Sequence, residues 1–204
     1  MRVISGTAKG RKLFSVPGSG TRPVTDRVKE ALFNIIGADV VGASLLDLFA
    51  GTGGVGIEAL SRGAAFVRFV EWQRAAVKTI RKNLAHCGLD DPARAEIRHM
   101  DAFALLQQPA DRRFDYVYIA PPQYHGLWEK ALRLLDANPA WLAEDGWVVV
   151  QIHPNEYHPV PLRHLRAFDQ RRYGSTLLVF YERGEEEPPA PPAEEEARPA
   201  PPQG

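Results

Sequence analysis

The chain has 204 residues, of which 45% are hydrophobic and 25% are charged, and its 25 basic residues balance its 25 acidic ones. This is ordinary composition for one globular domain with a substantial core. The single cysteine, Cys87, excludes an intramolecular disulfide and suits a reducing compartment, where we expect a packed, inert thiol. No apolar run is long enough to cross a bilayer, and the N-terminus lacks the apolar stretch of a signal peptide. We therefore expect a cytoplasmic protein that does not enter a membrane.

The zero net charge hides an uneven distribution along the chain. Residues 184–204 contain six glutamates and one arginine, so the preceding 183 residues carry a net charge of about +5. This last segment is rich in proline and has almost no apolar residues beyond alanine, which predicts a disordered tail. Such a tail either keeps the protein soluble or shields its basic body from other polyanions.

The first 24 residues are basic and rich in glycine. They predict a short β-hairpin that turns near Thr7 to Gly10, followed by an extended loop to Pro23. A helix of roughly residues 26–37 follows, with Thr25 as its N-cap and Gly37 at its end. Its apolar stripe consists of Val28, Leu32 and Ile35, with Arg27 and Lys29 pointing elsewhere.

From residue 45 onwards, short apolar runs alternate with longer amphipathic ones. The short runs are 45–49, 66–71, 95–100, 114–119 and 147–152, and the longer ones are 55–63, 73–88, 101–108 and 126–139. Strands that alternate with helices predict an α/β fold, a parallel sheet with helices on both faces. Residues 165–174 and 175–183 are two β-type runs joined by a tight turn, which predicts an antiparallel hairpin at the edge of that sheet.

The segment LDLFAGTGGVGIEAL passes from a strand through a glycine loop into a helix. Gly51, Gly53 and Gly56 satisfy the pattern G-x-G-x-x-G, and Glu71 follows about 20 residues later, where such folds place a ribose-binding acid. Glycines let the backbone turn sharply and approach a ligand, so this pattern serves any nucleoside-containing cofactor. A nicotinamide-dependent oxidoreductase is one interpretation that it leaves open.

Asp47, at the start of this segment, favours a different cofactor. A carboxylate beside the glycine loop would repel pyrophosphate, whereas S-adenosyl-L-methionine has no phosphate and carries a cationic sulfonium and an ammonium group. Asp101 follows the third strand, where it could accept from an adenine amino group while the Ala102 amide donates to the ring, or could cap a helix. Trp72 either flanks the adenine or packs on the neighbouring helix. The alternative for Asp47 is a purely structural role in the loop.

The fourth predicted strand ends in a proline-rich loop. It contains Ala120, Pro121, Pro122, Gln123 and Tyr124. Consecutive prolines remove two amide donors, so this loop presents carbonyl oxygens that can accept hydrogen bonds from an exocyclic amine and aim its lone pair. An aromatic side chain could stack on a base taken out of its helix. The alternative is a rigid turn that starts a helix near residue 127.

Several segments together resemble one protein family. RVISGTAKGRKL, TRPVTDRVKEALFNI, LLDLFAGTGGVGIEALSRGA, FVE and APPQYHGLWEKAL, in this order, are similar to the bacterial methyltransferases that modify guanine N2 in 16S ribosomal RNA. The likeness covers roughly residues 1–182. It implies a Rossmann-like class I methyltransferase fold with a seven-stranded sheet. It also implies S-adenosyl-L-methionine as cofactor and 16S rRNA, or a small-subunit assembly particle, as partner.

The resemblance also assigns roles to residues and segments. Residues 1–24 would hold RNA, residues 25–183 would form the catalytic domain, and residues 184–204 would be the tail. The implied cofactor contacts are Arg27, Asp47, Phe49, Ala50, Gly51, Gly53, Glu71, Trp72, Asp101 and Ala102. The implied RNA contacts are Arg2, Lys9, Arg11, Lys12 and Arg22. The six histidines lack metal-ligand spacing, so we expect no metal, and we expect a monomer.

The chain departs from the family pattern at the chemistry. The family loop usually reads Asp-Pro-Pro followed by Tyr or Phe, but Ala120 replaces the aspartate here and Gln123 takes the aromatic position. Our hypothesis is that the Pro121 carbonyl is the main acceptor, that Gln123 supplies a second and that Tyr124 stacks. The alternative is a catalytically weakened RNA-binding or ribosome assembly factor that keeps the cofactor fold.

Overall fold

The computed structural model of the protein describes residues 1–17 and 25–184. Arg22 and residues 185–204 of the expected tail lie outside the described residues.

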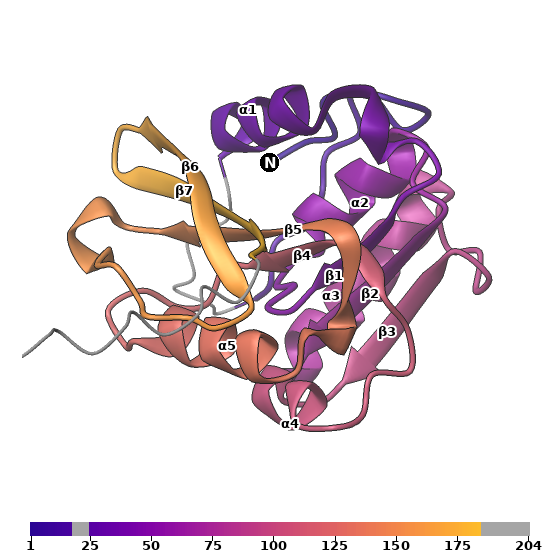
Figure 1. The fold of residues 1–204 in the computed structure, drawn as a ribbon. Coiled ribbons are helices and arrows are strands. Elements are labelled where there is room, and N and C mark those ends of the chain that lie inside the picture. Colours follow the sequence, from indigo (N-terminus) through magenta and orange to yellow (C-terminus); the bar gives the residue numbers. More distant parts are fainter. Residues whose placement is uncertain (18–24, 185–204) are drawn as a thin grey trace, which may run out of the picture.

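A seven-stranded sheet forms the centre of the molecule (Figure 1). Its strands are β1 (Ser44–Asp47), β2 (Phe66–Glu71), β3 (Ala95–His99), β4 (Phe114–Ile119), β5 (Leu142–Ile152), β6 (Leu165–Tyr173) and β7 (Thr176–Arg183). The spatial order is β3-β2-β1-β4-β5-β7-β6, with β1 to β5 parallel and β7 antiparallel to both of its neighbours. The predicted parallel sheet and its antiparallel hairpin are confirmed.

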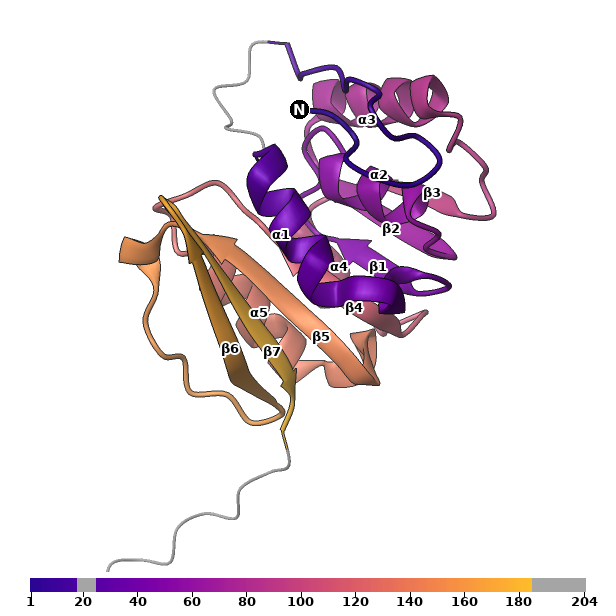
Figure 2. The same cartoon turned by 90° about the horizontal axis from the view of Figure 1, so that it is seen from above.

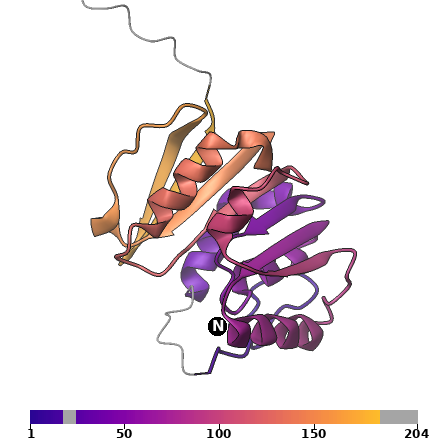
Figure 3. The same cartoon turned by 90° about the horizontal axis from the view of Figure 1, so that it is seen from below.

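Helices cover both faces of the sheet (Figures 1 and 2). On one face lie α1 (Asp26–Ile36), α2 (Gly54–Ser61) and α3 (Arg74–Cys87), and on the other lie α4 (Ala102–Leu106) and α5 (Leu127–Ala137), as Figure 3 shows. Short 3₁₀ turns follow at η1 (Gly37–Val40), η2 (Pro139–Trp141) and η3 (Pro154–Glu156). No helix in the described part of the chain is long and apolar enough to span a membrane.

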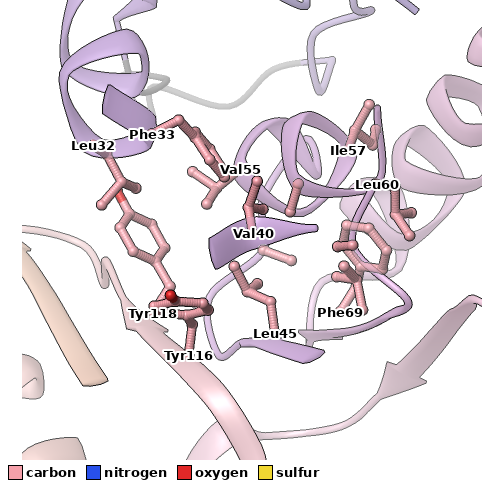
Figure 4. Packing of buried hydrophobic residues seen from close by; sticks show 14 of the residues in the cluster. Leu32, Phe33, Val40, Leu45, Val55, Ile57, Leu60, Phe69, Tyr116 and Tyr118 are labelled. Atoms are coloured by element: carbon pink, nitrogen blue, oxygen red, sulfur yellow. The ribbon is translucent and has the colours of Figure 1, made fainter. Parts of the chain in front are cut away.

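Alternating side chains of the strands divide the core into two layers. Leu45 of β1 and both Tyr116 and Tyr118 of β4 belong to the layer under α1 and α2, where Leu32 and Phe33 of α1 meet them (Figure 4). Their neighbours along the strands point to the layer under α4 and α5. Cys87 is buried in the first layer, so the expectation of a packed thiol is confirmed.

Helix α1 begins and ends where the sequence predicts, but its buried face differs from the predicted one. The Thr25 hydroxyl accepts from the Val28 amide as an N-cap, and Gly37 follows with φ 65°. Val28 and Leu32 are buried as expected. Ile35, predicted to lie on the buried stripe, is only half-buried, and Phe33 and Ile36 join the core instead.

Lys29 is the clear correction in this helix, because we expected it to point away from the core. Its side chain is fully buried, and its Nζ lies 3.2 Å from Glu58 Oε2 of α2 and donates to the Arg2 carbonyl. Burial lowers the pKa of Lys29, and the charge of Glu58 opposes that shift. The sequence pattern of the helix does not reveal that Lys29 is buried, because its partner Glu58 lies 29 residues further along the chain.

The N-terminal hairpin is reduced to one antiparallel bridge, between Arg2 and Lys12. Buried Val3, Ala8 and Leu13 anchor the segment to the core. The carboxylate of Glu58 accepts from the amides of residues 4 and 5 at 2.8 and 3.0 Å, and the amides of residues 7 and 8 bond to Ser61. The turn is therefore fixed to the C-terminal end of α2.

Candidate functional site

A cavity of about 700 Å³ lies at the carboxyl ends of β1, β2, β4 and β5. Parallel sheets bind ligands at this edge, because the loops that follow the strands converge there. The residues that line it are Met1, Ser15, Val16, Asp47, Phe49, Ala50, Gly51, Thr52, Gly54, Val55, Glu71, Trp72, Gln73, Ala76, Tyr118, Ala120, Pro121, Pro122, Gln123 and Gln151. A shallower hollow along α5 contains Glu129, which is already paired with Arg133 and His158.

Asp47 ends β1 and is only 2% exposed. Burial raises its pKa to about 7, amides of Gly56 and Phe49 oppose the shift, and the charge of Glu71 adds to it. No Lys or Arg of the described residues forms an ion pair with Asp47. Two acids that share a cavity without a cation favour a positively charged ligand and disfavour pyrophosphate.

Glu71 ends β2, next to β1 in the sheet. Its Oε2 accepts from the Gly51 amide at 2.9 Å, and its Oε1 accepts from the Gln73 amide at 2.8 Å. These two bonds fix the carboxylate between the glycine loop and the start of α3. Each oxygen keeps a second lone pair, which suits vicinal hydroxyl donors of a ribose.

Glycines give the loop between β1 and α2 its shape. Gly51 has φ 55° and Gly53 has φ 79°, a conformation that side chains rarely adopt. A Cβ on Gly56 would lie 2.3 Å from the ring of Phe69, so this glycine lets α2 pack closely on β2. The loop can therefore bring bare backbone to the cavity between the two acids.

The proline loop follows β4 on the opposite side of the cavity. Ala120 is half-buried, Pro121 is buried, and Pro122 and Gln123 are exposed. In the part of the chain that the structure describes, the Pro121 carbonyl accepts no hydrogen bond. Helix α5 begins at Leu127, as the sequence predicts. The loop is both a turn into a helix and a set of acceptors beside the cavity.

Tyr124 adopts the left-handed backbone conformation, with φ 65°. This is unusual for a bulky residue and costs roughly 1–3 kcal/mol. Its amide donates to Glu156 Oε1 at 2.7 Å, and its ring, 64% exposed, packs on His153 at 5.6 Å between centroids. Glu156 thus fixes the loop to η3, and Tyr124 stands beside the cavity rather than in its wall.

Several predicted contacts do not line the cavity. Asp101 caps α4 by accepting from the Phe103 amide at 3.3 Å, and Ala102 is buried in that helix. Gly53 lies behind the wall, where a Cβ would meet Ile57 at 3.2 Å. Arg27 is exposed in the first turn of α1.

The predicted RNA contacts that the structure describes all lie on the N-terminal segment and are exposed. They are Arg2, Lys9, Arg11 and Lys12. Arg2 Nε lies 3.5 Å from Asp26, and an Arg11 nitrogen donates to the His86 carbonyl at 2.6 Å. Lys9 lies in the turn near Ser61, at the end of α2 that is remote from the cavity. Met1 and Val16, by contrast, reach the cavity wall.

Sequence reasoning missed five polar residues in the wall, Ser15, Thr52, Gln73, Tyr118 and Gln151, of which the last two are bonded to each other. The Tyr118 hydroxyl donates to Gln151 Oε1, and burial raises the pKa of Tyr118 well above its usual value, so it stays a donor. Gln151 is a polar residue near the end of an otherwise apolar stretch of β5, and this position could have indicated that it faces the cavity. No pattern points to Met1 and Val16, because they reach the cavity wall only through the tertiary fold.

The fold and the cavity at its carboxyl edge define a class I methyltransferase, and comparison with known proteins agrees. The chain belongs to the family described as "Conserved hypothetical protein 95", whose profile matches residues 1–182. The predicted family relationship and fold are thereby confirmed.

Three similar proteins illustrate the relationship. YlbH of Bacillus subtilis is 39% identical over 186 residues, 90% of this chain and 99% of that protein. Ribosomal RNA small subunit methyltransferase D of Escherichia coli K12 is 38% identical over 183 residues, 90% of each chain. The solved structure of yhhF from Escherichia coli has a TM-score of 0.79 and 33% identity, and the match covers 91% of this chain and 99% of that one.

Proposed function

We propose that this protein transfers a methyl group from S-adenosyl-L-methionine to the exocyclic N2 amine of a guanine in 16S ribosomal RNA. One observation carries the proposal: two buried acids, Asp47 and Glu71, line a cavity that Pro121 also lines, and among the described residues the Pro121 carbonyl accepts no hydrogen bond. The names of the relatives support ribosomal RNA as substrate. Guanine N2 is our own extension, which rests on the family resemblance.

The lining fits S-adenosyl-L-methionine. That cofactor supplies an activated methyl group on a cationic sulfonium. Asp47 would face its positive charge, Glu71 would accept from its ribose, and the lining residues Phe49, Ala50, Gly51 and Trp72 would enclose it. Asp101 and Ala102 would reach the adenine from the rim, Gly53 shapes the loop from behind, and Arg27 would close over the methionine end.

The proline loop orients the base. The Pro121 carbonyl and the Gln123 amide oxygen would accept from the two N–H groups of the amine and direct its lone pair towards the methyl group. As the nitrogen–carbon bond forms, the carbon–sulfur bond of the cofactor would break, leaving a thioether, and one amine proton would pass to water. Gln123 lines the cavity and is exposed, so it can reach a base that enters. Tyr124 stacks on that base from the side of His153. Ala120 leaves room where the family has a carboxylate.

RNA would approach over the N-terminal segment. Arg2, Lys9, Arg11 and Lys12 contact phosphates, and Arg22 belongs to the same basic stretch in the sequence. In this proposal residues 1–24 bind RNA, residues 25–183 form the catalytic domain, and residues 184–204 form the acidic tail. It acts as a monomer, without a metal, in the bacterial cytoplasm.

Incubating the purified protein with small-subunit particles and methyl-labelled S-adenosyl-L-methionine tests this proposal. We expect label in 16S rRNA and N2-methylguanosine among its nucleosides by mass spectrometry. Label on another atom would refute guanine N2, and absence of label, with RNA still bound, would favour a non-catalytic assembly factor. Calorimetry should detect binding of S-adenosyl-L-homocysteine and none of NAD.

The acceptor role of Gln123 has its own test. Gln123→Ala should reduce kcat by on the order of 10²-fold, because one transition-state contact is lost. Gln170→Ala, an exposed glutamine on the edge strand β6, is the matched control and should not change kcat. Adding Ala120→Asp to the Gln123 variant should restore part of the turnover. Undiminished turnover in Gln123→Ala would exclude the role.

A further inference from the structure

Helix α3 has an exposed face with charge of one sign. Its sequence, RAAVKTIRKNLAHC, contains no acidic residue. Arg74, Lys78, Arg81 and Lys82 are all exposed, and spacings of four, seven and eight residues put them on one side of the helix. At 1.5 Å per residue, they form a row about 12 Å long.

These four cations are not neutralised within the described residues. No carboxylate forms an ion pair with any of them. Three other exposed arginines are paired: Arg133 with Glu129, Arg166 with Glu182 and Arg171 with Asp169. Since a surface helix gains stability from mixed charges, a row of unpaired like charges costs stability. Such a cost points to a ligand that bears the opposite charge.

The row begins at the cavity. Gln73 and Ala76, which flank Arg74, line the cavity wall, and so does Trp72, whose side chain is 65% exposed. From there the helix leads away beside the N-terminal segment, as Figure 2 shows. A strand that enters the cavity can therefore continue along α3 without leaving the protein surface.

Aromatic side chains stand at both ends of the row. Trp72 precedes it, and Phe14 of the N-terminal segment follows it, with Lys82 Nζ 3.7 Å from its ring and His86 edge-on at 5.2 Å. Two hydrogen bonds with Asn83 fix the Phe14 backbone on α3. Cations interleaved with exposed aromatic rings are typical of surfaces that bind single-stranded nucleic acid.

We propose that Arg74, Lys78, Arg81 and Lys82, which we call the α3 row, bind the phosphates of an RNA strand next to the target nucleotide. This inference rests on the proposed function, because it assumes that RNA reaches the cavity. It moves the main contact from the remote turn at Lys9 to a helix that starts at the cavity. RNA is favoured over a membrane, because the exposed face of α3 carries no large apolar residue to insert into a bilayer.

The test is binding of a fluorescent single-stranded 16S rRNA fragment, measured by anisotropy without cofactor. The triple variant Arg74→Gln/Lys78→Gln/Arg81→Gln should weaken binding by on the order of 10²-fold at ~0.1 M salt. The slope of log affinity against log salt concentration should become smaller by about 2, because each lost phosphate contact of a single strand accounts for ~0.7. Affinity for S-adenosyl-L-homocysteine should not change. Lys82 is retained because it packs on Phe14.

A variant with the same loss of charge serves as control. Arg112, Arg113 and Arg163 are exposed and precede β4 and β6, at the edge of the sheet opposite the cavity. Their change to glutamine should leave RNA affinity within about twofold. Equal losses in both variants, or no loss in the α3 variant, would overturn the proposal, as would binding to anionic vesicles through this row but not to RNA.

The two proposals fail separately. RNA that binds through the α3 row yet is never methylated would contradict the enzymatic function alone. Methylation that persists in the α3 variant with unchanged KM for RNA would contradict the α3 row alone.

Discussion

Asp47 is a buried acid whose charge depends on pH near neutrality. Its pKa is raised to about 7 by burial first and by Glu71 in addition. Because the ionised carboxylate attracts the sulfonium, affinity for S-adenosyl-L-methionine should increase roughly tenfold from pH 6 to pH 8, as the ionised fraction of Asp47 rises. Calorimetric titration between pH 6 and pH 8 measures this affinity.

Asp47→Asn is the control for this prediction. The variant should bind more weakly and with a flat pH profile, and parallel profiles in both proteins would contradict the assignment. Folding supplies a second readout. The unfolded chain releases this proton near pH 3.8 and the folded protein near 7, so the contribution of Asp47 to the free energy of unfolding falls as pH rises through that window.

Individual residues differ in how far the sequence predicted them. Asp47 and Glu71 were predictable, because they end strands of one parallel sheet and so must lie at one edge. Tyr124 was placed in the loop, but its strained φ and its bond to Glu156 were not foreseen, since they depend on a turn 32 residues later. Lys29 was mispredicted, because helical periodicity does not reveal a buried ion pair.

At the scale of elements, Glu58 joins three segments that are far apart in sequence. Its carboxylate, on α2, contacts Lys29 of α1, Arg62 just after α2 and the amides of Ile4 and Ser5. Lys29 and Glu58 are fully buried, so each charge depends on the other. Removing the charge of only one partner in a buried ion pair strongly destabilises a protein, whereas replacing both partners with apolar groups often does not.

Glu58→Gln should therefore lower the free energy of unfolding by about 3 kcal/mol, because Lys29 loses its counter-charge. Urea unfolding followed by circular dichroism measures this. Lys29→Met/Glu58→Gln should be more stable than Glu58→Gln alone. A double variant that is less stable than the single would show that Lys29 stabilises the fold through its bond to the Arg2 carbonyl even without its counter-charge.

The elements themselves were largely predictable, because apolar runs alternate regularly with amphipathic ones. The exception is β5, which starts at Leu142 rather than at the predicted residue 147. Its first half reads LAEDG, and acidic residues with glycine are typical of turns. Gly146 is needed there for packing, since a Cβ would lie 3.0 Å from the Asp115 carbonyl.

At the scale of the molecule, the two faces of the sheet are covered unequally. Helices α1 to α3 lie over the β1 side of one face, and within residues 1–17 and 25–184 no helix covers β6 and β7 there (Figure 2). Phe168 is 40% exposed on that face and packs on Trp147 at 5.2 Å. The nearby Arg166 and Arg171 are paired with acids, so this surface lacks the unbalanced charge of the α3 row.

The position of Met1 has a practical consequence for anyone who purifies this protein. Its thioether packs against the glycine loop so closely that a Cβ on Gly54 would meet the sulfur at 2.5 Å. A polyhistidine tag joined directly ahead of Met1 would begin at a residue that lines the cavity, and we expect it to compete with what enters there. Titrations on such material would report weakened affinity that belongs to the tag.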